Sequence, residues 1–309
     1  MNVLLAQPRG FCAGVARAVD IAEQALERFG APVYVYHEIV HNGHVVRDLA
    51  SRGAIFVDDI ADIPEGAVTV FSAHGVAKSV VEEANRRHLQ VIDATCPLVT
   101  KVHLQADRYS QRGYTIIVVG HAGHEEVEGT KGSVSGPVHV VGTVDEIEAL
   151  SIPVSTPLAY VTQTTLSLDD TRELIAALRD RFPDIVGPGL DDICYATQNR
   201  QRAVQQLAKR VDLVIVVGAR NSSNTNRLQE VAADYGVPAR LIEHADEIEL
   251  IWLDGVEHVG VTAGASTPEH LVQGVCQKLQ RLGAGAIREL PGIVETLRFR
   301  LPEALRQTA

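Results

Sequence analysis

Three cysteines recur at the starts of similar stretches of this sequence. Each precedes a segment with helical periodicity, and a polar tip follows 29, 28 or 30 residues later. The pairs are Cys12 with His41, Cys96 with His124, and Cys194 with Asn224. A cysteine at the start of a helix is favoured as the thiolate by the positive end of the helix dipole. Three thiolates with no fourth at a matching position suit a cubane iron–sulfur cluster in which one iron has no Cys ligand.

Two other interpretations of the cysteines stay open. With 12 histidines in the chain, a Cys₃His zinc site has enough candidate ligands. Three separate buried cysteines are also a common arrangement. The fourth cysteine, Cys276, shares a helical stripe with Val272, Val275 and Leu279, which predicts core packing. The chain has no CxxC pair, which argues against a zinc ribbon or a thioredoxin-like motif.

The polar tips carry histidines, hydroxyls and an amide in corresponding places. Taken alone, each of these residues is more typical of a structural or surface position. Their placement at equivalent tips favours a shared cavity, because the carboxyl ends of parallel strands are where such sheets bind ligands. Imidazole, hydroxyl and backbone N–H donors suit a compact polyanion such as diphosphate. The predicted binding residues are His41, His74, His124, Ser222, Ser223, Asn224 and Ser266.

Glu126 follows His124 by two residues in HEEVEG. In a closed cavity a desolvated carboxyl group can be held protonated and serve as a proton donor. The alternative is a solvated acidic turn, because Glu125 and Glu128 lie alongside. GTKGS (129–133) lacks Walker A spacing and GAGAIRE (283–289) lacks the third glycine of a dinucleotide fingerprint. No bound NAD or flavin is therefore expected.

Apolar runs that end in polar tips alternate with helical periods, which predicts an α/β fold with parallel sheets. The expected strands and their tips lie in 33–40, 67–75, 114–124, 157–165, 212–224 and 257–267. Their fixed order predicts three similar α/β units arranged around a pseudo-threefold axis with a central iron–sulfur cluster. The expected boundaries are 1–95, 96–193 and 194–281, with 282–309 as a C-terminal tail packing back on the body.

Composition excludes several classes of protein. The 309 residues carry a formal net charge of −11, whereas nucleic-acid binders normally have a basic surplus. No stretch approaches the ~18 apolar residues of a membrane span, and the N-terminus does not resemble a signal peptide. We expect a cytoplasmic protein without a membrane or nucleic-acid partner.

The motifs together resemble the 4-hydroxy-3-methylbut-2-enyl diphosphate reductase family over roughly residues 1–275. The resemblance rests on segments of up to twelve residues around the candidate positions. These segments are PRGFCAGVARAV, HEIVHN, SAHGV, DATCPLV, GHEEVEGT, VTQTTLS, DDICYATQNRQ, RNSSNTNRL and TAGASTP.

The resemblance implies the last step of the non-mevalonate isoprenoid pathway. In that step an allylic alcohol diphosphate is reductively dehydroxylated to isopentenyl and dimethylallyl diphosphates. It implies one 4Fe–4S cluster held by the three cysteines, with the substrate oxygen on the iron that has no Cys ligand. It assigns the polar tips to the diphosphate pocket, names Glu126, Thr164 and His124 as catalytic, and makes Glu126 the proton donor. Gln163 and Thr165 flank Thr164. A ferredoxin or flavodoxin is the implied electron donor.

Two other functions compete with this one. The first is a non-catalytic iron–sulfur protein, either an electron carrier or a redox sensor, which needs no deep donor-lined cavity. The second is a zinc hydrolase acting on a phosphorylated metabolite. The metal content of the protein separates all three.

Overall fold

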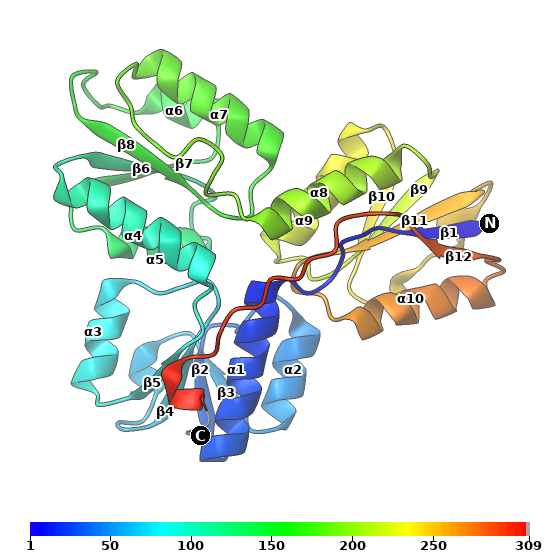
Figure 1. The fold of residues 1–309 in the computed structure, drawn as a ribbon, viewed down its shortest axis with the longest axis horizontal. Coiled ribbons are helices and arrows are strands. Elements are labelled where there is room, and N and C mark those ends of the chain that lie inside the picture. Colours follow the sequence, from blue (N-terminus) through cyan, green and yellow to red (C-terminus); the bar gives the residue numbers. More distant parts are fainter. Residues whose placement is uncertain (307–309) are drawn as a thin grey trace. The chain divides into compact units, whose positions relative to one another are not determined.

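The computed structural model describes residues 1–306, which form three β-sheets with only parallel strand pairings among them (Figure 1). The α/β fold with parallel sheets is therefore confirmed. The chain makes two compact bodies. The first body contains residues 1–16, 41–45 and 195–298, and the second contains 17–40, 46–194 and the chain from 299 onward.

Two of the sheets belong to the second body. The strands of one are β2 (Val33–Tyr36), β3 (Ala54–Val57), β4 (Val68–Phe71) and β5 (Gln90–Asp93), in the order β3-β2-β4-β5. The strands of the other are β6 (Thr115–Val119), β7 (Val138–Val141) and β8 (Leu158–Thr162), in the order β7-β6-β8. The helices between them are α1 (Ala13–Phe29), α2 (Gly43–Ser51), α3 (Lys78–Arg86), α4 (Pro97–Gln111), α5 (Glu125–Ser133), α6 (Val144–Ala149) and α7 (Leu168–Arg181), with the short η1 (Ile60–Asp62).

The third sheet forms the centre of the first body, in the order β10-β9-β11-β1-β12. Its strands are β1 (Asn2–Leu5), β9 (Leu213–Val217), β10 (Ala239–Ile242), β11 (His258–Ala263) and β12 (Ile287–Glu289). The helices that follow are α8 (Tyr195–Ala208), α9 (Ser223–Asp234) and α10 (Glu269–Arg281), with short turns η2 (Ala245–Glu247) and η3 (Leu250–Leu253). The last described element is η4 (Glu303–Leu305).

Strands with uninterrupted apolar runs are covered on both faces. In β6, Ile117 and Val119 pack with residues of α6 and α7, whereas Ile116 and Val118 pack with residues of α4 and α5. Figure 1 shows these two helix pairs on opposite sides of the β6–β8 sheet. Strand β9 repeats the pattern, with alternate residues facing α10 on one side and α8 and α9 on the other. Side chains alternate across a strand, so an all-apolar strand requires a helix layer on each face.

The three sheets share one strand order. In each, the first strand of the set lies between the second and the third, as in β3-β2-β4, β7-β6-β8 and β10-β9-β11. A fourth segment then pairs with the third strand: β5 beside β4, Val186 bridged to Ala159 of β8, and β1 beside β11. Each fourth segment leads directly to one of the three cysteines. This shared order is independent support for the internal repeat seen in the sequence.

The chain start is placed differently from the predicted segment 1–95. Strand β1 pairs with β11 and β12 in the third sheet, so the first strand completes the sheet of the last repeat. This happens because the repeat begins one strand before each cysteine, and for Cys12 that strand is the N-terminal one. The remaining boundaries stay predictions.

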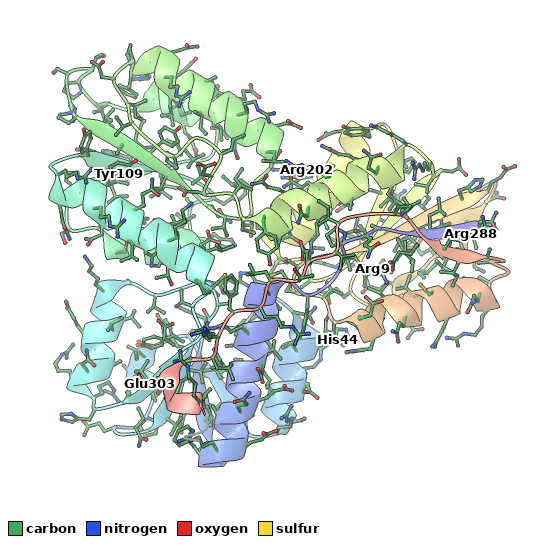
Figure 2. The ribbon with its side chains drawn as sticks, viewed as in Figure 1. Arg9, His44, Tyr109, Arg202, Arg288 and Glu303 are labelled. Atoms are coloured by element: carbon green, nitrogen blue, oxygen red, sulfur yellow. The ribbon has the colours of Figure 1, made fainter. Side chains whose placement is uncertain are left out.

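The C-terminal segment begins with β12 at the sheet edge and continues without helix or strand until η4. Arg288 on β12 and Glu303 in η4 mark its two ends in Figure 2. At Gly292 a Cβ atom would overlap the backbone carbonyl of Gln7, so this stretch lies directly against the N-terminal segment. Within residues 1–306, no helix has the combined length and apolar character that crossing a membrane requires.

Candidate functional site

Each of the three candidate ligand cysteines stands immediately ahead of a helix, as predicted. Cys12 precedes α1, Cys96 is the N-cap of α4, and Cys194 precedes α8. All three are free and partly exposed. At Cys12, the Sγ atom accepts a hydrogen bond from the backbone N–H of Val15 at 3.5 Å. The unpaired amides of a helix start therefore face a sulfur, which favours the thiolate.

A backbone hydrogen bond fixes each cysteine to the loop after the third strand of a sheet. The accepting carbonyl always belongs to the second residue after that strand. The bonds run from Cys12 to Ala265 (3.1 Å), from Cys96 to Ala73 (3.0 Å) and from Cys194 to Thr164 (3.0 Å). All three acceptors lie in the predicted polar tips, so every cysteine is held against a tip.

Glu126 is buried in the first turn of α5, with 2% of its surface exposed. Its Oε1 accepts a hydrogen bond from the Thr164 N–H at 2.6 Å, and its Oε2 accepts one from the Thr164 hydroxyl at 2.9 Å. His124 is the N-cap of the same helix, and its Nδ1 accepts from the Glu126 N–H at 3.2 Å. The solvated acidic turn considered above is therefore wrong for Glu126.

Asn224 in the first body occupies the place that Glu126 has in the second. Both lie seven residues after the end of the first strand of their sheet. The Asn224 Oδ1 accepts from the Ala265 N–H at 2.8 Å, as Glu126 accepts from the Thr164 N–H. In both cases the same peptide then receives the cysteine N–H on its carbonyl, so one residue separates a functional side chain from a cysteine.

This register corrects the one read from sequence spacing. His124 aligns with Ser222, because both are N-caps that start a helix after the first strand. Asn224 aligns with Glu126 rather than with His124. The first sheet has Gly43 at this position, and there the Ala73 N–H donates to the Ile39 carbonyl instead.

Hydroxyl groups complete the polar tips of the first body. The Ser222 Oγ accepts from the Thr225 N–H at 3.3 Å, which caps α9. Ser223 follows it in the first turn and is partly buried. The Ser266 hydroxyl donates to the His41 carbonyl at 2.8 Å. The Asn224 Nδ2 is buried and has no hydrogen-bond partner within residues 1–306, so an amide donor is available to a ligand.

An ion pair joins two tips of the second body. The His74 Nδ1 lies 2.7 Å from a carboxylate oxygen of Glu125, and the His74 and His124 ring centroids are 6.1 Å apart. This body contains His74, Cys96, His124, Glu126, Thr164 and Cys194. The first body contains Cys12, His41, Ser222, Ser223, Asn224 and Ser266.

Comparison with known proteins gives a consistent result. The family model described as LytB protein matches residues 3–280. The chain belongs to the LytB family. A relative from Zymomonas mobilis subsp. mobilis, named 4-hydroxy-3-methylbut-2-enyl diphosphate reductase, is 56% identical over 99% of this chain and 90% of its own length.

Two solved structures are also similar to this LytB chain. One is the E-1-hydroxy-2-methyl-but-2-enyl-4-diphosphate reductase of Plasmodium falciparum, with 37% identity and a TM-score of 0.93 over 98% of this chain and 96% of that one. The other is titled (E)-4-hydroxy-3-methyl-but-2-enyl diphosphate reductase, the terminal enzyme of the non-mevalonate pathway. It has 34% identity and a TM-score of 0.64 over 91% of this chain and 100% of that one. The resemblance stated from the sequence is therefore confirmed.

His103 is a supporting residue of the LytB site that the sequence analysis missed. It lies on α4, and its ring packs against Gly75 and Gly129, where an added Cβ would lie 2.7 and 3.2 Å from its Cε1. Gly75 has a φ of +79°, which glycine adopts without strain. The ring thereby supports both the His74 tip and helix α5. The two glycines opposite an inward helix position were the available sequence signal.

Burial of His103 makes the stability of this LytB chain depend on pH. Desolvation lowers the pKa of His103 from 6.5 to about 4, although Asp93 acts in the opposite direction. As the pH falls from 6.5 toward 4, the unfolded chain takes up a proton at this position that the folded chain does not. The free energy of unfolding therefore falls across this window, by on the order of 2–3 kcal/mol at its lower end.

Chemical denaturation at pH 7 and pH 4.5 measures this effect. His103→Gln should lower stability at pH 7 but reduce its loss on acidification. His270→Gln, at an exposed position of α10, should leave the loss unchanged. Equal pH dependence in the wild type and in His103→Gln would contradict the assignment.

Proposed function

We propose that this oxidoreductase of the LytB family converts 4-hydroxy-3-methylbut-2-enyl diphosphate to isopentenyl and dimethylallyl diphosphates. Removal of the allylic hydroxyl as water consumes two electrons and two protons and leaves a C–H bond in place of the C–O bond. The observation that carries the proposal is the Glu126–Thr164 pair, because a buried carboxyl group in hydrogen-bond contact with a hydroxyl lies one residue away from a candidate cluster ligand.

The residues present fit an iron–sulfur cluster. Three free, partly exposed thiols lie ahead of three helices, each held by the same type of backbone bond. We therefore propose Cys12, Cys96 and Cys194 as the ligands of one 4Fe–4S cluster, at the axis of a pseudo-threefold arrangement of the repeats. When bound, the cluster supplies single electrons and an iron without a Cys ligand that acts as a Lewis acid on the substrate oxygen.

The chain itself provides proton delivery. Hydroxide is a poor leaving group, so its departure requires a proton in the transition state. Glu126 stores that proton, and the Thr164 hydroxyl, 2.9 Å away, orients the substrate hydroxyl or passes the proton to it. His124 caps the helix that carries Glu126 and fixes the first residues of α5.

The diphosphate supplies binding energy away from the reacting carbon. We assign it to the donors of the polar tips: His41, His74, His124, Ser222, Ser223, Asn224 and Ser266. The buried Asn224 Nδ2 supports this assignment, because a donor without a protein partner needs an acceptor from a ligand. Anchoring this end fixes the allylic carbon for reaction. A ferredoxin or flavodoxin as electron donor and a cytoplasmic location stay predictions.

Anaerobic purification and turnover test the proposal. The protein should contain iron and sulfide, show charge-transfer absorption in the visible range, and release the two isoprenoid diphosphates when given the allylic diphosphate and a chemical reductant. A colourless protein with one zinc would contradict the proposal and favour a hydrolase. An iron–sulfur protein that accepts electrons without consuming the substrate would indicate a carrier or sensor.

A further inference from the structure

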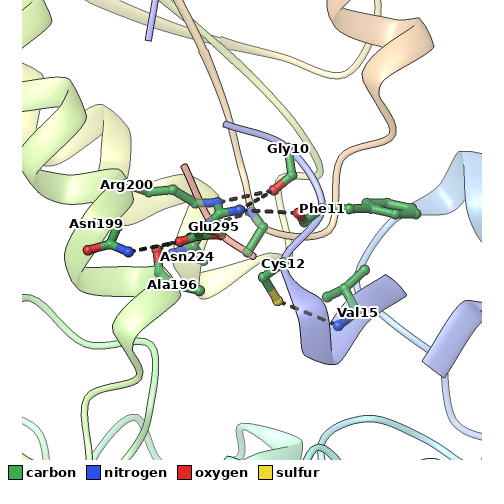
Figure 3. A network of polar contacts seen from close by, with 10 residues as sticks. Gly10, Phe11, Cys12, Val15, Ala196, Asn199, Arg200, Asn224 and Glu295 are labelled. Atoms are coloured by element: carbon green, nitrogen blue, oxygen red, sulfur yellow. Dashed lines mark hydrogen bonds and ion pairs between the residues drawn. The ribbon is translucent and has the colours of Figure 1, made fainter. Parts of the chain in front are cut away.

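A buried arginine fixes the backbone immediately ahead of Cys12. Arg200 lies on α8 with only 1% of its side chain exposed. Its Nε and Nη2 donate to the Gly10 carbonyl at 3.1 and 2.7 Å, and Nη2 also approaches the Phe11 carbonyl at 3.3 Å (Figure 3). Since the Cys12 N–H is bound to Ala265, the peptides on both sides of the Phe11–Cys12 link are held.

Arg17 makes the same kind of contact ahead of Cys96. It lies on α1 and is partly buried. Its Nη1 donates to the carbonyls of Ala94 at 3.2 Å and Thr95 at 3.1 Å. These are again the two residues that precede a cysteine, and the donor is again a guanidinium from a helix that follows another cysteine.

Lys101 provides a weaker version ahead of Cys194. It lies on α4, its Nζ donates to the Asp191 carbonyl at 2.9 Å, and it approaches the Asp192 carboxylate at 3.8 Å. Its side chain is 49% exposed. The contact reaches the third residue before the cysteine, and a single ammonium replaces the two-pronged guanidinium.

The three contacts follow one rule. Each basic residue lies five or six positions after one cysteine and holds the backbone ahead of the next one in a closed series. The helix after Cys12 serves Cys96, the helix after Cys96 serves Cys194, and the helix after Cys194 serves Cys12. We propose that Arg17, Lys101 and Arg200 are positioning residues that set the geometry and the reduction potential of the iron–sulfur group, which itself belongs to the proposed function.

The C-terminal segment engages both arginines. The Arg200 Nη1 lies 3.2 Å from both carboxylate oxygens of Glu295, and the Arg17 Nε donates to the Arg300 carbonyl at 2.8 Å. Asn199 also donates to Glu295 at 3.0 Å. A buried guanidinium requires such a counter-charge. The segment after β12 therefore holds the two arginines in the orientation that reaches the cysteine loops.

Charge and geometry give separate consequences. Groups around the ligands of a metal centre orient the ligands, and their replacement typically weakens metal binding ~10–100-fold. A cation close to the cluster also stabilises its reduced, more negative state. Loss of Arg17 or Arg200 should therefore speed iron loss and lower the reduction potential. Loss of the exposed Lys101 should have a smaller effect, because water screens its charge.

The test compares Arg17→Gln, Lys101→Gln and Arg200→Gln in the full chain with two control variants. Arg28→Gln on α1 and Arg202→Gln on α8 remove the same charge from exposed positions of the same helices (Figure 2). Three quantities are measured under anaerobic conditions: the rate of iron loss to a chelator, the reduction potential, and amide exchange at residues 10–12, 94–96 and 191–194.

The two arginine variants should lose iron at least ~10-fold faster than the controls. Their reduction should be disfavoured about tenfold, which is ~59 mV for a one-electron couple. Wild-type iron loss and potential in both variants would overturn the proposal. Should Arg200→Gln fail to fold, Arg17→Gln at its partly exposed position decides the question. Exchange at 94–96 needs no cluster, so it tests the Arg17 contact even if the wild type binds no iron and the proposed function fails.

Discussion

Replacing Cys194 by alanine is expected to abolish turnover and to leave the purified protein without an intact iron–sulfur cluster. A cluster held by three thiolates has no spare protein ligand, so the loss of one leaves two irons without Cys. The fold should survive, because the Cys194 side chain is only partly buried and its backbone N–H still donates to Thr164. Iron and sulfide counts, the visible spectrum and turnover with a chemical reductant measure the effect.

Cys276→Ala is the matched control for this substitution. Cys276 packs in the core with Val272, Val275 and Leu279 of α10. Burial raises the pKa of its thiol, so it stays protonated and is a poor metal ligand. Iron content and turnover should equal those of the wild type, with at most a small loss of stability. Equal loss of iron in both variants would show that the ligand set is wrong.

Local sequence patterns predicted the elements of this fold well. The strands in 114–124 and 212–224 were predictable because both faces of a parallel sheet are covered, which leaves continuous apolar runs. The helices after Cys12, Cys96 and Cys194 were predictable from their periodicity. The core position of Cys276 followed from the same reasoning.

Contacts between distant segments were beyond those patterns. That β1 completes the third sheet depends on pairing with β11, more than 250 residues away. Arg200 resembles any polar residue of an amphipathic helix until the Gly10 and Phe11 carbonyls are seen beside it. His103 is similar, since its burial depends on two glycines of other elements. Such residues are selected by a three-dimensional environment that periodicity does not encode.

The spacing of the cysteines carried part of this information. The repeat predicted that the three cysteines occupy equivalent positions, and the shared bond to the second residue after a strand agrees with that. Spacing alone aligned His124 with Asn224, two residues out of register. Loops of different length precede these positions, so only the helix starts fix which residues correspond.

Replacing Glu126 by glutamine should lower turnover by roughly 10²–10⁴-fold, the range typical of a lost general acid. The amide keeps the size of the side chain and its oxygen still accepts from the Thr164 N–H, while the Thr164 hydroxyl can rotate to accept from the new NH₂ group. The variant should therefore fold, keep its iron and bind the diphosphate. What it lacks is a proton to give to the departing hydroxide.

Iron content separates this variant from the cysteine variant, because Glu126→Gln should be inactive with its cluster in place. Glu128→Gln is the matched control: it removes a carboxylate from an exposed position of the same helix, where Glu128 pairs with Lys131. Turnover of the control should stay within about twofold of the wild type, since exposed ion pairs contribute little. Near-normal turnover of Glu126→Gln with reduced donor would instead assign proton delivery to another group, and Thr164 with its bound water would then be the first to examine. Because Glu126 and Cys194 share the Thr164 residue as a hydrogen-bond partner, a shift in the cluster spectrum of Glu126→Gln would further show that proton donor and metal ligand are coupled through that residue.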